Sequence, residues 1–210
     1  MAFVTYMQMS RTIYFLFRLF IFLNCIFQVF GQVSNNLPVG WFSAGDSQQE
    51  YQMGIDYTTF YGKAPSGFIK SLPNVNESGF GTLMQNFFPK DYLGKHVRFS
   101  CAIKYNNVLN WAGMWVRVDS VNGGLDNMYG RRITGTGDWK VVENIVNVPG
   151  DTNVFAFGIL LSGEGEVWID ECNFELAEYV PSPTFYSNPN ADNFGMLTYT
   201  TSFGSVYQLN

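Results

Sequence analysis

The chain has 210 residues, of which 47% are hydrophobic and 14% are charged, with 12 basic against 17 acidic side chains and a formal net charge of −5. This length accommodates one domain with a substantial core plus extensions. The acidic balance argues against nucleic acid as a partner, because phosphate backbones bind basic surfaces and no run of Lys or Arg is interleaved with aromatic residues.

Residues 1–31 have the pattern of a signal peptide. Arg11 and Arg18 precede an apolar stretch over 19–30, and a small residue follows where a signal peptidase cleaves. The alternative is an uncleaved signal anchor, since 13–30 is almost wholly apolar and near the lower limit for spanning a bilayer. Charged and amide side chains interrupt that stretch, which favours cleavage. We expect a secreted protein that leaves the membrane after cleavage, with ten basic and 17 acidic groups and a net charge of −7.

Short segments rich in β-branched and aromatic residues recur from about residue 37 to 177, separated by Gly, Pro, Asn and Asp. This is typical of strands joined by turns. No window of helical length keeps a 3.6-residue hydrophobic period. The expected strands are 67–72, 82–88, 97–105, 111–119, 140–148, 154–161 and 167–176. We predict an all-β domain over 32–179, an antiparallel β-sandwich of the jelly-roll type.

The strand expected at 111–119 has two different faces. One face carries Ala112, Met114, Val116 and Val118, an ordinary core pattern. The other face carries Trp111, Trp115, Arg117 and Asp119. Aromatic planes beside fixed charges suit either a groove for a polar ligand or a second packed layer.

Three patterns stand out in the last third of the chain. The segment 154–161 is apolar at both parities, which favours a central strand covered on both faces. In 167–176 the apolar parity changes near Asp170 and Glu171, which predicts a β-bulge that projects a carboxylate sideways. From 180 to 210 the composition shifts to Ser, Thr, Asn and Pro, and we expect a tail with little fixed structure.

The cysteines leave two alternatives open. Cys25 falls within the expected signal peptide, so Cys101 and Cys172 remain as an even pair at core-facing positions. Either they form a disulfide, worth about 4 kcal/mol in the chain-entropy model, or they pack as two buried thiols. Asn76 opens the only Asn-X-Ser/Thr sequon and is a candidate glycosylation site.

Several blocks of the sequence resemble a known module: GWFSAGDSQQEYQMGID, SGFIKS, GFGTLMQNF, DYLGKHVRFSCAIK, WAGMWVRVD, LDNMYGRRITGTGDW and FGILLSGEGEVWIDECNFE. The module is the β-sandwich found at the C-terminus of some bacterial AraC-type transcriptional regulators and in stand-alone proteins. The resemblance covers about 40–175 and implies a galactose-binding-like jelly roll, similar to carbohydrate-binding modules. It implies fold rather than function, and no helix-turn-helix segment accompanies it here.

This chain departs from the module at two places. Where the module usually has an alanine and a valine, the chain has Cys101 and Cys172, a paired change that favours the disulfide. Where the module usually has Arg-Pro, the chain has Arg131 and Arg132, and the loss of proline loosens that turn.

A sugar site needs an apolar plate for the C–H face of the ring and planar polar groups for its hydroxyls. The candidate ligand-binding residues are Trp111, Trp115, Arg117, Asp119, Asp126, Asn127, Arg131 and Gln85. Gln85 shares the parity of Leu83 and Phe87, and a buried amide there needs partners in the protein or in a ligand. In the alternative interpretation the tryptophans pack under a loop and the charged residues form a structural network. Trp139 and Trp168 are expected in the core.

Metal binding and catalysis have weaker support. Asp46, Asp170 and Glu171 are candidate ligands of a structural calcium ion, with solvated carboxylates at a bulge as the alternative. No other cofactor is expected. The sole histidine, at position 96, has the pattern of a surface residue, and there is no Gly-rich phosphate loop and no zinc-ligand cluster in the sequence. Asp119 and Asp126 are the carboxylates that a glycosidase would need.

We therefore expect a secreted β-sandwich that binds a carbohydrate or another polar ligand without catalysis. A second hypothesis is a protein–protein interaction or structural module that uses the same face or the aromatic tail. A third is a small carbohydrate-active enzyme with paired acids.

Overall fold

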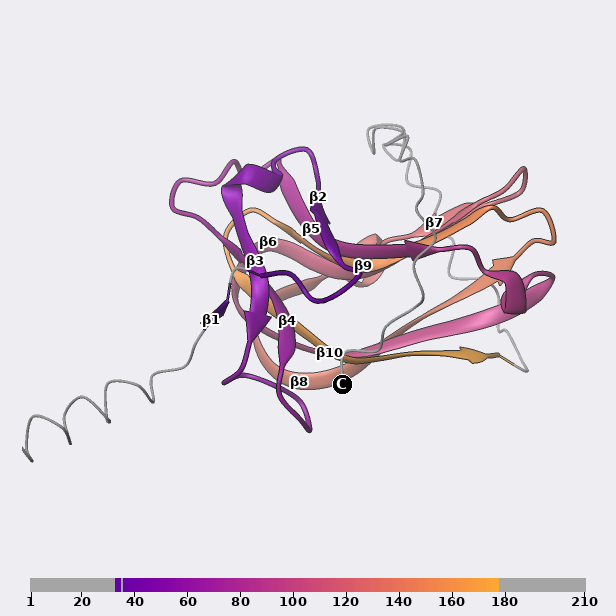
Figure 1. Ribbon diagram of the computed structural model, residues 1–210. Coiled ribbons are helices and arrows are strands. Elements are labelled where there is room, and N and C mark those ends of the chain that lie inside the picture. The colour runs from indigo at the N-terminus through magenta and orange to yellow at the C-terminus, as the bar shows by residue number, and fades with distance from the viewer. Residues whose placement is uncertain (1–32, 35, 178–210) are drawn as a thin grey trace, which may run out of the picture. The chain divides into compact units, whose positions relative to one another are not determined.

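The computed structural model describes residues 33–34 and 36–177, and β-strands dominate this part of the chain (Figure 1). The strands are β1 (Val33–Ser34), β2 (Phe42–Ala44), β3 (Tyr51–Asp56), β4 (Ser66–Ser71), β5 (Phe80–Phe87), β6 (Lys95–Asp119), β7 (Gly124–Asp126), β8 (Ile133–Val148), β9 (Val154–Ser162) and β10 (Glu166–Leu176). Single turns of 3-10 helix are η1 (Gln48–Glu50), η2 (Lys90–Tyr92) and η3 (Tyr129–Arg131). The predicted signal peptide at 1–31 and the predicted tail at 180–210 lie outside the described residues. Within those residues, no helix has the length and apolar character needed to cross a membrane.

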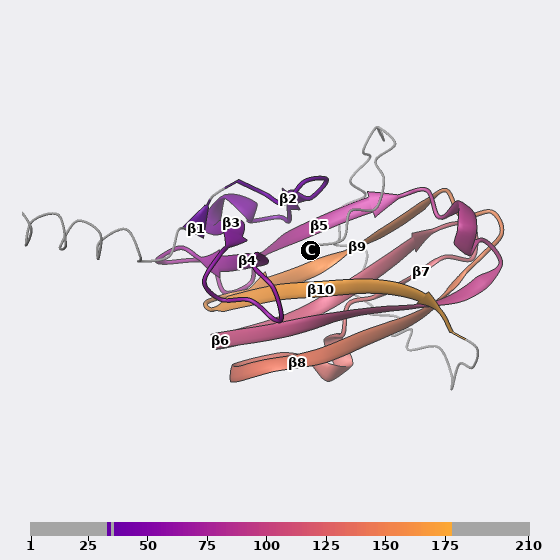
Figure 2. The same ribbon diagram turned by 60° about the horizontal axis from the view of Figure 1, so that its bottom comes forward.

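The strands form the predicted antiparallel β-sandwich, and the 25-residue strand β6 runs through both of its layers. The first half of β6 pairs with β10 and β8, and β10 continues through β4 to β3 and β1. The second half of β6 pairs with β9 and β7, and β9 continues through β5 to β2. We call these layer A and layer B; Figures 1 and 2 show them lying one over the other.

The sequence predicts two strands, at 97–105 and 111–119, where the structure has β6 alone. Three of the five residues between them are asparagines, which favour turns, and Asn107 adopts a positive φ of 51°. The chain nevertheless stays extended, and the irregularity appears as register shifts against β8 between Ile103 and Ala112. The turn-forming residues therefore produce bulges that let one strand pass from layer A to layer B.

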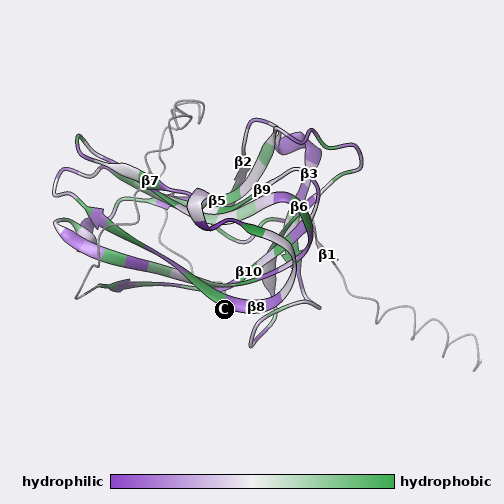
Figure 3. Ribbon diagram, turned by 180° about the vertical axis from the view of Figure 1, so that it is seen from behind, coloured by the Kyte–Doolittle hydropathy of each residue, from purple (hydrophilic) through white to green (hydrophobic). Residues whose placement is uncertain are grey.

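A large aromatic core fills the space between the layers. Figure 3 shows hydrophobic and hydrophilic positions alternating along the strands, so that each strand contributes one apolar face. Phe99 of layer A stacks on Phe174 with ring centroids 4.6 Å apart, and Phe174 meets Phe157 of layer B edge-on at 4.8 Å. β9 pairs with β6 on one side and β5 on the other, which confirms the central strand expected at 154–161.

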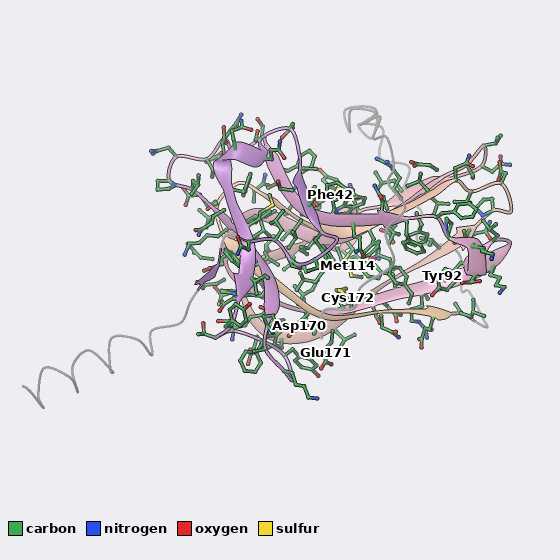
Figure 4. All side chains as sticks on the ribbon, viewed as in Figure 1. Phe42, Tyr92, Met114, Asp170, Glu171 and Cys172 are labelled. Carbon is green, nitrogen blue, oxygen red and sulfur yellow. A yellow bond between two sulfur atoms is a disulfide. The ribbon has the colours of Figure 1, made fainter. Side chains whose placement is uncertain are left out.

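Cys101 and Cys172 form a disulfide, and the strand that carries Cys172 has a bulge beside it. Asp170 pairs with Ala102, and Asn173 pairs with Ser100, so two residues of β10 oppose one residue of β6. Glu171 takes a positive φ of 44° at this point. Both the disulfide and the predicted bulge are therefore confirmed, and the bulge turns Cys172 toward the core, where Figure 4 shows it between the layers together with Met114.

Candidate ligand-binding face

The outer face of layer B carries a second apolar cluster, separate from the core between the layers. Its buried members are Ala44, Met84, Trp115, Ala156 and Leu160, and the half-buried residues around them are Phe42, Phe80, Trp111, Leu125 and Val154. The alternate residues of β6, Met114 and Val116 among them, belong to the core. The period-two assignment of the two faces of this strand is confirmed. We call the outer one the β6–β9–β5 face.

Trp115 forms the floor of this face rather than an exposed plate. It is only 4% exposed, and its indole Nε1 donates a 2.8 Å hydrogen bond to the hydroxyl of Thr82. Thr82 donates in turn to the carbonyl oxygen of Ile159 at 2.8 Å. The residue opposite Trp115 on β9 is Gly158, which adds no side chain of its own to the space beside the indole. Trp115 is thus packed and satisfied in its hydrogen bonding.

Trp111 lies at the rim of the β6–β9–β5 face and contacts Tyr129, a loop residue that the sequence did not single out. The ring of Tyr129 meets Trp111 edge-on, with centroids 5.5 Å apart and planes at 87°. The guanidinium carbon of Arg132 lies 4.6 Å from the centroid of Tyr129. This loop passes close over Gly113, where a Cβ would come within 2.8 Å of the carbonyl oxygen of Asn127. A glycine on the strand therefore permits the loop to bring Tyr129 to Trp111.

Arg117 and Asp119 lie at the other end of the same face and pair with each other. Arg117 Nε is 2.8 Å from Asp119 Oδ1, and Nη2 is 3.1 Å from Oδ2. Their side chains are 28% and 41% exposed, so both retain polar edges that face solvent. Two residues apart on a strand, they point to the same side, as the sequence predicts.

Asp126 and Arg131 form a second ion pair on the inner side of layer B. Asp126 pairs with the core-facing Val116 and is only 1% exposed. Arg131 reaches its two carboxylate oxygens at 3.2 and 2.8 Å and also donates to the carbonyl oxygen of Glu143 at 3.0 Å. The side chain of Asn127 accepts from the Tyr129 amide at 3.1 Å. Asp126 and Arg131 hold the loop to β8, and Asn127 closes a turn within the loop, as in the alternative structural interpretation.

Gln85 lies on the inner side of layer B, and the three expected calcium ligands are not brought together. Gln85 is buried, opposite the core residue Phe157, and its Oε1 has no hydrogen-bond partner in the described part of the chain. Asp46 accepts the Phe80 amide at 2.9 Å, whereas Asp170 and Glu171 belong to the bulge of layer A. No group of three or more His, Cys, Asp or Glu residues among residues 33–34 and 36–177 is arranged to hold a metal ion.

The outer side of layer A has its own buried carboxylates, which hold the loop between β3 and β4. Asp170 accepts the Tyr61 amide at 2.7 Å, and burial, with a smaller contribution from Glu171, raises its pKa above the ordinary value. Burial alone would raise the pKa of Asp56 as well. Hydrogen bonds from Thr58, Thr59 and Trp168 outweigh that effect and leave the Asp56 pKa below its ordinary value.

Trp139 and Trp168 were expected in the core, and this is confirmed for the burial of Trp168 but wrong for Trp139. Trp168 is buried, but on the outer side of layer A, where its Nε1 donates to Asp56 at 2.8 Å. Trp139 is half-buried and contacts Tyr61, with centroids 5.8 Å apart. Aromatic content alone could not distinguish the core from a surface covered by a loop. The glycosylation candidate Asn76 is exposed in a turn that its own side chain closes onto Ser78.

No protein-family model matches the chain. The HTH-type transcriptional regulator YbfP of Bacillus subtilis strain 168, described as uncharacterized, is 40% identical over 147 residues. The match covers 68% of this chain and 50% of the regulator, so the chain spans half the length of the curated relative it matches. This relationship agrees with the resemblance to regulator modules, and the AraC-type assignment stays a prediction.

Solved structures share the fold at low sequence identity. The enzymatically active domain of tailspike protein 4 from bacteriophage CBA120 has a TM-score of 0.51 at 12% identity, covering 70% of this chain and 21% of that one. The C-terminal family 22 carbohydrate-binding module of Clostridium thermocellum Xyn10B has a TM-score of 0.48 at 13% identity, covering 72% and 94%. The likeness to the tailspike domain shows the fold alone.

Proposed function

We propose that this domain binds carbohydrate without catalysis through the β6–β9–β5 face. The observation that carries the proposal is the placement of the Trp111–Tyr129 pair and the Arg117–Asp119 pair on one surface. The aromatic pair offers an apolar plate for the C–H face of a sugar ring. The ion pair offers donors and acceptors for hydroxyl groups, because each of its side chains is partly exposed.

The packing beneath the rim supports the same proposal. Trp115 is fixed by the Thr82 hydroxyl, and its neighbours on β9 and β5 are buried. A floor that does not rearrange lowers the entropic cost of ordering the residues that contact a ligand. The packed and hydrogen-bonded floor therefore supports a role of this face in binding.

The positions of the carboxylates favour binding over catalysis. A glycosidase needs two carboxyl groups that flank one glycosidic bond. Asp119 points to the outer side of layer B, whereas Asp126 points to the inner side, and each is held by an arginine. This arrangement does not present the two acids to a common substrate.

Secretion is part of the proposal. The disulfide supports it, because such bonds persist in oxidising compartments. The predicted signal peptide at 1–31 points the same way. The test is whether expression of the full chain in a secreting host yields protein in the medium that lacks residues 1–31, as read by N-terminal sequencing.

Binding is tested with a glycan array and with pull-down on insoluble polysaccharides. The wild-type domain is expected to be retained by at least one polysaccharide, and Trp111→Ala to lose at least about tenfold in affinity, since one such contact is worth on the order of 1.5 kcal/mol. Absence of wild-type binding across the array, or full binding by Trp111→Ala, contradicts the proposal.

A protein-interaction role is the second candidate, and the loop between β3 and β4 favours it. Tyr57, Phe60 and Tyr61 are all exposed on this loop, although two buried carboxylates hold its backbone. Exposed aromatic side chains on a fixed backbone are typical of protein interfaces. If the Tyr57→Ala variant no longer binds a protein partner but still binds polysaccharide normally, protein binding belongs to layer A and carbohydrate binding to layer B.

A further inference from the structure

We infer that the glycan bound by the β6–β9–β5 face is acidic, and that Arg132 binds its anionic group at the rim. The inference rests on the proposed function, because it names the class of sugar for the same face. The shared chemistry is a carboxylate or sulfate on a sugar ring.

Arg132 is the only arginine of the described residues whose charge is not matched by a carboxylate. Arg117 pairs with Asp119, Arg131 pairs with Asp126, and on layer A Arg98 pairs with Glu175 at 2.7 Å. No carboxylate of residues 33–34 or 36–177 forms an ion pair with Arg132, which is exposed. Its guanidinium contacts the Tyr129 ring instead.

The local backbone directs the adjacent side chains of Arg131 and Arg132 to different sides of layer B. The single turn η3 is closed by a 2.8 Å hydrogen bond from the Arg131 amide to the Met128 carbonyl. Arg131 then extends inward to the buried Asp126 and fixes the loop. Arg132, the next residue, lies over the outward-facing Tyr129. The ion pair of the first arginine therefore positions the second at the rim of the binding face.

The contact with Tyr129 suits Arg132 for recognition. Cζ lies 4.6 Å from the ring centroid, and the ring is itself braced edge-on by Trp111. A cation over an aromatic face loses part of its mobility, and a guanidinium presents a fork of N–H donors that matches a carboxylate or sulfate. A sugar that packs on Trp111 would thus place a ring substituent within reach of Arg132.

The charges of the neighbouring residues favour Arg132 over a nearby pocket as the site for the anionic group of the glycan. A pocket of about 490 Å³ lies beside the start of the strand segment that carries Trp111 and is lined by Leu109 and Asn110 of β6. Glu77 and Glu164 also line it, and two carboxylates would repel an anionic substituent. On the face itself the Arg117–Asp119 pair is neutral, so Arg132 supplies its unmatched positive charge.

The test uses polymer pairs that share a backbone and differ in charge. Polygalacturonate and its fully methyl-esterified form share one backbone, and a sulfated polymer such as dextran sulfate, beside dextran, separates sulfate from carboxylate. Neutral xylan and galactan complete the panel. Affinity electrophoresis measures binding by the wild type, Arg132→Ala, Arg132→Lys and the control Lys140→Ala. Lys140 is a matched control because it lies over the ring of Tyr105, with its Nζ 4.9 Å from the centroid.

The wild type is expected to prefer an acidic polymer over its uncharged partner by at least about tenfold, the usual worth of a hydrogen bond to a charged group. Arg132→Ala should lose that preference, Arg132→Lys should keep part of it, and Lys140→Ala should keep all of it. Equal binding of charged and uncharged partners, or an undiminished preference in Arg132→Ala, overturns this inference and leaves the proposed function intact. Absence of binding to every polymer overturns both. An unchanged melting temperature in Arg132→Ala excludes misfolding as the cause.

Discussion

The indole of Trp115 donates to the hydroxyl of Thr82 at 2.8 Å, and that bond joins β6 to β5 across the intervening strand β9. Thr82 extends the connection by donating to the Ile159 carbonyl. Two tryptophans four residues apart on one strand face therefore differ in environment. Trp115 holds three strands of layer B together, and Trp111 is half-buried at the rim.

Trp115→Ala is expected to lower the free energy of unfolding by about 3–5 kcal/mol, because it opens a cavity in the second apolar cluster. Trp115→Phe should cost less, since it keeps an aromatic ring and loses the bond to Thr82 and only part of the buried indole volume. Urea unfolding measures both, with the half-buried Trp111→Ala as the comparison. Equal costs for Trp111→Ala and Trp115→Ala would show that the two residues do not differ in this way.

The two ion pairs of layer B should differ in their contribution to stability. Arg131→Ala leaves the carboxylate of Asp126, 1% exposed, without its cation, and should cost about 3–5 kcal/mol. Arg117→Ala leaves the half-exposed Asp119 in contact with water and should cost at most about 1 kcal/mol. Thermal melts rank the variants. Adding Asp126→Asn to Arg131→Ala should recover part of the loss, and a double variant as unstable as the single one argues against an unpaired charge as the cause.

Reduction of the disulfide between Cys101 and Cys172 should destabilise the domain by about 4 kcal/mol, because the bond closes a long loop in the unfolded chain. Intact mass before and after reduction should differ by two hydrogens for this bond. The variant with both cysteines changed to alanine should unfold at the same urea concentration with and without reductant. Alkylation of both thiols in unfolded, unreduced protein would contradict the bond.

The free energy of unfolding should depend on pH through Asp170, whose contribution decreases as the pH rises. Its raised pKa means that the folded state binds more protons than the unfolded state at pH values above the ordinary 3.8. Its contribution to stability therefore falls as pH rises through the interval between the two pKa values. The free energy of unfolding of the wild type minus that of Asp170→Asn should decrease with pH there. Asp56→Asn is the control, because the lowered pKa of Asp56 gives the opposite slope below 3.8.

The alternation of residues predicted the sandwich, the central strand and both faces of β6, since strand parity is a local property. The same reasoning predicted the bulge at Asp170, where the apolar parity changes. The depth of each side chain depends on distant strands. Trp115 is buried because β5 and β9 bring Thr82, Met84 and Leu160 to it, and 111–119 alone holds no trace of those partners.

The loop after β7 escaped prediction for a related reason. The register of β7 against β6 turns Asp126 toward the inner side of layer B, and strand pairing over three residues leaves little pattern in a sequence. Met128 adopts a positive φ of 60°, which is unusual for a methionine and could not be predicted from the sequence. Tyr129 and Arg132 reach the outer face only because of this loop conformation. The sequence thus identified the strand side of the candidate site and missed the loop side.

Binding at the β6–β9–β5 face is tested most directly by an NMR titration that follows the indole N–H signals while a retained oligosaccharide is added. Trp111 and Trp139 are both half-buried, each contacts one tyrosine, and they lie on opposite layers. We expect the Trp111 signal to shift in a saturable manner and the Trp139 signal to stay in place. A saturable shift of Trp139 with an unchanged Trp111 would contradict binding at the β6–β9–β5 face.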